Sequence, residues 1–200
     1  MEVGLLVEGS LDEIVGAALL ENASIPPGIV YGKRGWQYIR SRIQGFNNSS
    51  VGYPILAIVD FMDTSEECPA AIRSNWVQNQ HENMIFRVAV PEIESWLLAD
   101  QEGFAQFLGI KRHFVPEQPD IGPDAKFTVM QLASRSPHRL RRDAIVPKEG
   151  FSASEGPLYT SEMAAFVRDQ WNIERACKGS PSLRATVRSV HDLSERLRQE

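Results

Sequence analysis

Short apolar runs bounded by turn residues alternate with longer amphipathic stretches over the first half of the chain. Four of these runs predict β-strands, at residues 3–7, 29–31, 55–59 and 84–90. Between them, apolar residues recur at helical spacing, which predicts helices over residues 11–22, 36–46 and 69–80. A strand–helix alternation of this kind is typical of a mostly parallel sheet covered by helices. We therefore expect an α/β domain with a four-stranded sheet over residues 1–100.

The second half of the chain carries helical periodicity without further strand-like runs. A helix is expected to open at Glu92, and three more are expected over residues 126–134, 161–171 and 182–198. Residues 116–124, which are rich in Pro, Gly and Asp, and residues 147–157 are expected to be irregular. Residues 101–200 should then form a helical region that packs on the α/β domain.

Carboxylates follow the first and third predicted strands. Glu8 comes directly after one run, and Asp60 and Asp63 follow the other. The carboxyl ends of parallel strands meet at one edge of a sheet, where open α/β folds bind their ligands. Converging carboxylates repel one another unless a cation lies between them, and oxygen ligands suit Mg²⁺ or Mn²⁺. We expect these three residues to form a metal site, although acids that cap neighbouring helices would give the same pattern.

Two more acidic residues follow the fourth predicted strand and so belong to the same edge. We expect Glu94 to complete the metal shell and Glu92 to assist catalysis, for example by orienting a water. A solvated helix start, which favours acids, is the alternative. Lys126 stands at the start of a predicted helix, where the helix dipole disfavours a cation. We interpret it as a partner of the acidic cluster or of a scissile phosphate, with a catalytic role.

Basic residues occur in two places that suit contacts with phosphates. Lys33 and Arg34 follow the second predicted strand, and Arg139, Arg141 and Arg142 form the densest basic stretch of the chain. Beside an acidic metal centre, such residues would position a nucleic-acid strand. Solvated turns and faces are the alternative for both places.

Composition narrows the class of protein. The 200 residues are 42% hydrophobic and 24% charged, as in an ordinary globular protein, and the net charge of −5 argues against coating nucleic acid by bulk electrostatics. Cys68 and Cys177 lie far apart in the sequence and lack a ligand-spaced partner, so they indicate neither a disulfide framework nor a zinc site. No apolar run approaches the roughly 20 residues that span a bilayer, and the first residues predict a strand rather than a basic, apolar signal sequence. We therefore expect a cytoplasmic protein without membrane contact. The chain also lacks a P-loop motif.

Several of these stretches resemble one group of known families. A strand that ends in Glu-Gly and a strand that ends in paired Asp residues, within a compact α/β unit, resemble the Toprim domain of topoisomerases, bacterial primases and OLD-type nucleases. The wider chain resembles a Toprim-related bacterial family of unknown function, domain of unknown function 4276. The resembling stretches are residues 7–9, 59–68, 87–100, 124–126, 156–159 and 180–183. Within them, the Glu-x-Glu-x-Trp-Leu-Leu-Ala-Asp segment at 92–100 is the most specific.

The resemblance implies a Toprim-like fold and a Mg²⁺-dependent or Mn²⁺-dependent nuclease. Glu8 would act as ligand or general acid/base, and Asp60 with its partner would be ligands. Members of the wider group are expected to cleave DNA or RNA and to associate with a separate ABC/SMC-like ATPase in bacterial anti-phage defence. Whether the chain forms a homodimer is left open by the sequence.

Two departures from the family pattern bear on this expectation. The usual Asp-x-Asp pair is replaced by Asp60-Phe61-Met62-Asp63, and a thioether such as that of Met62 is a poor Mg²⁺ ligand. Relatives often carry a basic residue where Pro91 precedes Glu92. The alternative function is therefore a non-catalytic Toprim-like module that binds or regulates a partner ATPase or nucleic acid. A third possibility, nucleotidyl transfer, lacks a visible nucleotide-binding motif.

Overall fold

The fold is an α/β sheet domain followed by a set of helices. The computed structural model describes residues 1–122, 124–148, 150 and 153–199. The strands and first helices are β1 (Val3–Val7), α1 (Ser10–Asn22), β2 (Pro27–Gly32), α2 (Gly35–Ser49), β3 (Ile55–Asp60), α3 (Pro69–Trp76) and β4 (Met84–Ala89). The remaining helices are α4 (Ile93–Leu98), α5 (Gln101–Leu108), η1 (Arg112–Phe114), η2 (Pro119–Ile121), α6 (Ala125–Ser134), α7 (Arg139–Ile145), α8 (Tyr159–Asp169), α9 (Ile173–Gly179) and α10 (Pro181–Leu197).

The four strands form one parallel sheet in the order β2-β1-β3-β4. This confirms the α/β fold class that the strand–helix alternation predicts. The chain runs from β1 outward to β2 and from β3 outward to β4, so the strand order reverses between β1 and β3. Open α/β sheets bind their ligands at the carboxyl edge of such a switch point.

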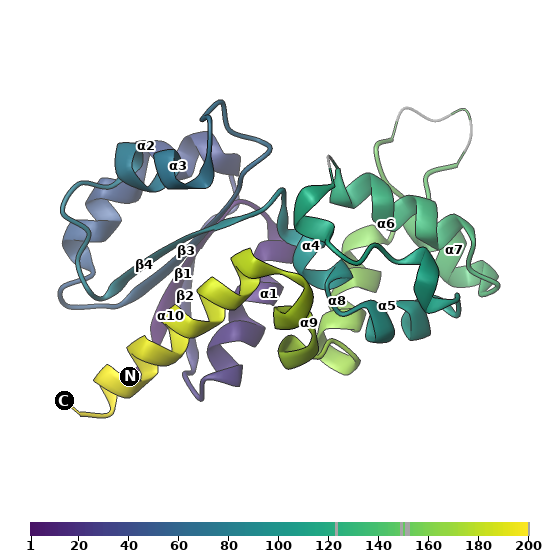
Figure 1. The fold of residues 1–200 in the computed structure, drawn as a ribbon. Helices are drawn as coiled ribbons and strands as arrows, with labels where there is room; N and C mark the ends of the chain where they lie inside the picture. Colours follow the sequence, from purple (N-terminus) through teal and green to yellow (C-terminus); the bar gives the residue numbers. More distant parts are fainter. Residues whose placement is uncertain (123, 149, 151–152, 200) are drawn as a thin grey trace.

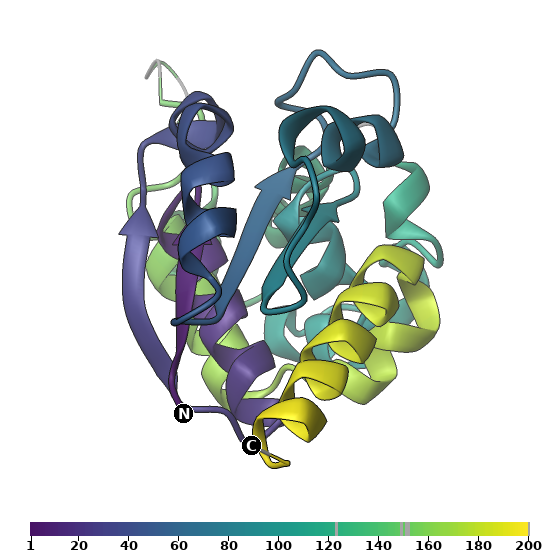
Figure 2. The same ribbon diagram turned by 90° about the vertical axis from the view of Figure 1, so that its left-hand side faces the viewer.

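Helices cover both faces of the sheet, and the direction of each connection determines the face. Right-handed crossovers that leave the sheet in opposite directions place their helices on opposite faces. Accordingly, α2 and α3 lie on one side of the sheet, and α1, together with α10, lies on the other (Figures 1 and 2). Strand β1 is buried along its whole length because apolar side chains meet it from both sides.

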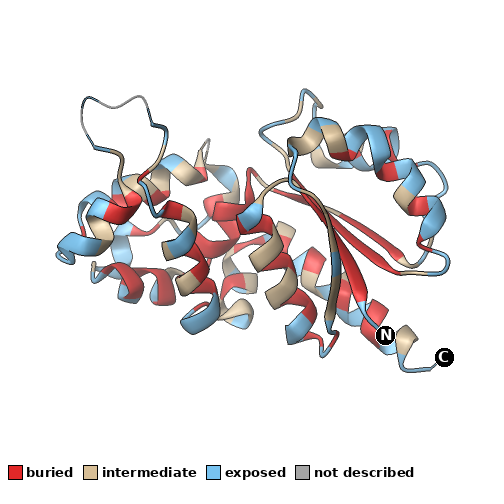
Figure 3. Ribbon diagram, turned by 180° about the vertical axis from the view of Figure 1, so that it is seen from behind, coloured by how far each residue is buried: buried red, intermediate tan, exposed pale blue. Residues whose placement is uncertain are grey.

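The larger hydrophobic core runs from the sheet into the C-terminal helices without a break at residue 100. It joins residues of β1 and α1 to Trp96, Phe104 and Phe166, all of which are fully buried. Phe104 and Phe166 meet edge to face, with ring centroids 5.1 Å apart. Figure 3 shows this buried layer continuing from the strands into the helices. The helical second half therefore packs on the same face of the sheet as α1.

Short helices account for the main differences from the expected elements. Helix α3 ends at Trp76 rather than near residue 80, because Val77 is extended and the amide of Gln78 donates to the Gln44 side chain at 2.8 Å. Helices α7 and α9 and the 3₁₀ turn η2 were not expected. Helices this short depend on tertiary packing rather than on a periodic pattern. Within the expected irregular segment 147–157, residues 149, 151 and 152 lie outside the described residues.

The helices were compared with the length and hydropathy of a membrane span. Over residues 1–122, 124–148, 150 and 153–199, none combines the length and the hydropathy that a bilayer requires.

Asp100 links α9 to the start of α5 through hydrogen bonds. It is the last residue of the Glu-x-Glu-x-Trp-Leu-Leu-Ala-Asp segment. The Asp100 carboxylate is fully buried and accepts from the Gly103 amide at 3.1 Å and the Asn172 amide at 2.8 Å. It also accepts from the Arg175 guanidinium at 2.7 and 2.9 Å. The most specific segment of the resemblance thus ends on a structural carboxylate.

We predict that Asp100→Ala destabilises the fold by about 3 kcal/mol or more, because it leaves buried amides and a guanidinium without their acceptor. Urea denaturation would measure the change. The matched control is Asp143→Ala, which removes a half-exposed partner of Arg139 and Arg142. That change should cost less than about 1 kcal/mol. Equal effects of the two variants would contradict the structural role of Asp100.

Candidate metal centre

The carboxyl ends of β1 and β3 bring two of the expected acids together. Glu8 directly follows β1, and Asp60 is the last residue of the neighbouring strand β3. The Glu8 carboxylate accepts from the backbone amide of Asp60 at 2.8 Å. The prediction that these two residues meet at one edge of the sheet agrees with this contact.

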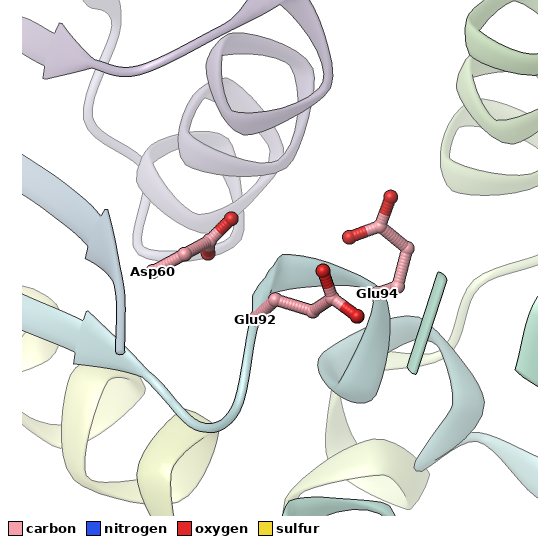
Figure 4. A group of neighbouring side chains, drawn as sticks. All are labelled: Asp60, Glu92 and Glu94. Carbon is pink, nitrogen blue, oxygen red and sulfur yellow. The ribbon is translucent and has the colours of Figure 1, made fainter. Parts of the chain in front are cut away.

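Asp60 belongs to a trio of carboxylates with Glu92 and Glu94. One oxygen from each lies within 4.8 Å of the other two. Figure 4 shows the three side chains gathered where the chain after β4 turns into α4. Asp60 comes from β3, whereas Glu92 caps the start of α4 and Glu94 lies in its first turn. One strand end and one helix start therefore contribute the three carboxylates of this trio.

A protein donor holds one oxygen of each carboxylate in the trio. Asp60 accepts from the Ile93 amide at 2.8 Å, and Glu92 accepts from the Lys126 amide at 2.6 Å. Glu94 accepts from the Tyr159 hydroxyl at 2.9 Å. Fixing one oxygen in this way orients a carboxylate and leaves the other oxygen for a metal.

Asp12 adds a carboxylate that sequence reasoning missed. It lies in the first turn of α1, is 5% exposed, and has a buried Oδ1 atom without a hydrogen-bond partner among the described residues. Its charge raises the pKa of Asp60 and of Glu8, so it lies near both. The i, i+4 spacing of Glu8 and Asp12 across the start of a helix was a weak signal of this proximity.

The trio, Glu8 and Asp12 together form a carboxylate cluster, and burial raises the pKa of all five carboxyl groups. Desolvation is the largest cause in each case, and repulsion from neighbouring carboxylates adds to it. The pKa of Glu8 rises to about 8, that of Asp12 to about 6 and that of Glu94 to about 7. The pKa of Asp60 rises well above its ordinary value, and that of Glu92 is also raised. The cluster holds more negative charge than its surroundings offset.

Among the described residues, Lys126 is a cation whose charge acts on this cluster. Its ammonium forms an ion pair with Glu155 and lies over the Tyr159 ring, 5.0 Å from the centroid. Partial burial alone would lower the pKa of Lys126, but Glu155, together with the charges of Glu94 and Glu92, raises it. The prediction that Lys126 is a partner of the acidic residues agrees with this position. Neither Glu155 nor Tyr159 carried a signal in the sequence that pointed to the site.

Asp63 occupies a different position from the other acids. It follows β3 in a turn, and its side chain is exposed. It does not belong to the trio whose ligand oxygens lie within 4.8 Å of one another. Its charge still raises the pKa of Glu8 and of Asp12, which places it at the rim of the cluster. Its expected role as a metal ligand stays a prediction.

The expected nucleic-acid contacts are engaged with other residues of the chain. Lys33 forms an ion pair with Glu13, and Arg34 lies over the Tyr38 ring at 5.5 Å. The three arginines of the basic stretch belong to α7, at the end of the molecule away from the sheet (Figure 1). Arg139 and Arg142 pair with Asp143, and Arg141 pairs with Glu162 at 3.0 Å. Their role in binding nucleic acid also stays a prediction.

The donor set of the cluster fits a divalent cation. All candidate ligands are carboxylate oxygens, which hard ions such as Mg²⁺ and Mn²⁺ prefer. The unpartnered, buried oxygen of Asp12 and the raised pKa values indicate that, among the described residues, Lys126 does not balance the charge of these carboxylates. Comparison with protein-family models, curated proteins and solved structures finds no match to this chain. The assignment therefore depends on the geometry and the charge of the cluster itself.

We predict that Glu8→Gln stabilises the metal-free protein at alkaline pH. The Glu8 carboxyl binds its proton more tightly in the folded state, because its pKa rises from 4.5 to about 8. Stability contributed by the protonated carboxyl is present below pH 4.5 and is lost as the pH rises toward 8. The variant escapes this loss and should be more stable than the wild type by on the order of 1–2 kcal/mol above pH 8.

Thermal unfolding across this pH range, in the presence of a chelator, would measure the difference. The gap between variant and wild type should close toward pH 4.5, and Mn²⁺ should raise the wild-type melting temperature most at the alkaline end. A gap that does not change with pH would show that Glu8 is not desolvated in this way.

Proposed function

We propose that this chain is a metal-dependent nuclease that hydrolyses phosphodiester bonds in nucleic acid. The observation that supports the proposal is the trio of Asp60, Glu92 and Glu94 at the carboxyl edge of a parallel sheet, with one oxygen of each within 4.8 Å of the other two. The Toprim-like resemblance suggests the same chemistry and the same edge of the sheet. It also motivates the further proposal of a separate ABC/SMC-like ATPase partner in bacterial anti-phage defence.

Asp60, Glu92 and Glu94 would hold the metal, Mg²⁺ or Mn²⁺, through the oxygens that the protein's own donors leave free. When bound, such an ion polarises a phosphoryl oxygen and lowers the pKa of a water. Each carboxylate is oriented by a backbone amide or a hydroxyl. Asp63 at the rim would contribute an outer contact.

Glu8 is suited to proton transfer. A general acid/base works best when its pKa lies near the operating pH, and burial raises the pKa of Glu8 to about 8. One Glu8 oxygen is engaged with the Asp60 amide, so the other would accept or release the proton. Lys126, whose ammonium is partly exposed beside the cluster, would stabilise negative charge that develops on a phosphate oxygen.

We predict that Asp60→Asn and Glu94→Gln each lower Mn²⁺-dependent cleavage of plasmid DNA or of RNA by about 100-fold or more, because each removes a charged oxygen ligand. Gel assays of purified protein would measure cleavage, with a chelator as the blank. Glu67→Gln, an exposed change with the same loss of charge, is the matched control and should leave the rate unchanged. Asp63→Asn should have a smaller effect than either change in the trio.

Metal-dependent cleavage that survives both changes would contradict the assignment. Tight metal binding without cleavage of any of these substrates would favour the alternative, a non-catalytic module that binds or regulates a partner ATPase or nucleic acid.

A further inference from the structure

A cavity lies along the outer edge of the sheet, beside β4 and outside the carboxylate cluster. Strand β4 is an edge strand, with α3 on one side and α10 on the other (Figure 1). The cavity has a volume of about 450 Å³, and residues of all three elements border it. This volume falls in the range of pockets that hold small ligands or parts of larger ones.

Two arginines border this cavity. Arg73 comes from α3 and Arg87 from β4. Neither forms an ion pair with a carboxylate in the described part of the chain. Burial, and next the charge of Arg73, lower the pKa of Arg87 to about 10, whereas the weaker influence of Asp192 raises it. The cavity wall therefore carries two arginines against one carboxylate, Asp120, in a chain whose net charge is −5.

The Arg87 guanidinium is held in place by hydrogen bonds of its terminal nitrogens. One terminal nitrogen donates to the Ser189 hydroxyl and the other to the Phe86 carbonyl at 3.2 Å. Its Nε atom is buried and has no partner among the described residues. A partly buried cation without a counter-charge is unfavourable, and an anion in the adjoining cavity would offset that cost.

Asp120 favours a ligand that also carries hydrogen-bond donors. It borders the same cavity, and one of its oxygens accepts from the Ser182 amide at 3.1 Å. The other oxygen is buried and has no partner among the described residues. A bare anion would meet repulsion from this carboxylate. A nucleotide unit combines a phosphate, which suits Arg73 and Arg87, with hydroxyl and amino donors, which suit Asp120.

The cavity lies close to the carboxylate cluster along the chain. Val90 borders the cavity, and two residues further along the chain Glu92 belongs to the trio. Arg87 and Glu92 are separated by five positions, which span at most about 18 Å even in a fully extended chain. A strand of a few nucleotides can cover that distance.

We propose that this cavity binds a backbone phosphate of the nucleic-acid strand, with Arg73 and Arg87 contacting the phosphate and Asp120 accepting from a sugar or base donor. The inference rests on the proposed function, and it assigns strand positioning to residues of the β4 edge. The arginines of α7 differ because each of them already pairs with a carboxylate.

The test is binding of a short fluorescein-labelled single-stranded DNA, and of the matching RNA, by fluorescence anisotropy with a chelator present. Arg73→Gln and Arg87→Met should each weaken binding by about tenfold. Each should also make the slope of log affinity against log salt concentration shallower, by about the amount that one phosphate contact contributes. Arg188→Met removes the same charge from an exposed position of α10 outside this cavity and should leave binding within about twofold.

Thermal unfolding separates binding from a structural role. Arg87→Met should keep or raise the melting temperature, because it removes a partly buried charge without a counter-charge. Unchanged oligonucleotide affinity in both cavity variants would overturn the inference, as would equal weakening by Arg188→Met. Displacement of the oligonucleotide by inorganic phosphate as readily as by a mononucleotide would overturn the nucleic-acid assignment in favour of a simple phosphate site.

The chelator keeps this test independent of cleavage. If wild-type protein binds the oligonucleotide through these arginines but fails to cleave it with Mn²⁺, the nuclease proposal fails and the binding site stands. If cleavage occurs while the cavity variants bind and cleave as the wild type does, the cavity assignment fails and the nuclease proposal stands.

Discussion

Mutual repulsion among buried carboxylates is the interaction on which this account depends. Glu8, Asp12, Asp60, Glu92 and Glu94 share one partly buried space at the carboxyl edge of the sheet, and desolvation raises the pKa of each. Lys126 acts on them but is already paired with Glu155. Such a cluster needs either bound protons or a cation to balance it. A divalent ion with oxygen ligands is the cation that we propose for this role.

The topology of the sheet brings these residues together. Because strand order reverses between β1 and β3, the acids that end these two strands meet where no connection covers the edge. The cap and first turn of α4 then add Glu92 and Glu94 from the end of β4. On the far side of β4, the uncompensated arginines present the opposite charge. The proposed cation site thus lies at the carboxyl end of the sheet, and the proposed phosphate site lies along its β4 edge.

Sequence patterns predicted the elements that have strong periodicity and the residues that end them. The buried strands and their terminal acids follow from alternation and from the geometry of parallel sheets, which is why Glu8 and Asp60 were found. Asp12 and Tyr159 were missed because only tertiary packing turns them toward the cluster. The exposure of Asp63 likewise depends on how the turn after β3 folds. Short helices such as α7 were not predicted from the sequence, because tertiary packing rather than helix propensity stabilises them.

Calorimetric titration of purified protein with Mn²⁺ at neutral pH tests the central claim most directly. The account predicts one binding event for the wild type, with protons released because carboxyl groups of raised pKa give up their protons to the metal. Repeating the titration in buffers of different ionisation enthalpy would count those protons, and Asp60→Asn should abolish or greatly weaken the event. Wild-type protein that binds no Mn²⁺, or an Asp60→Asn variant that binds it unchanged, would contradict the account.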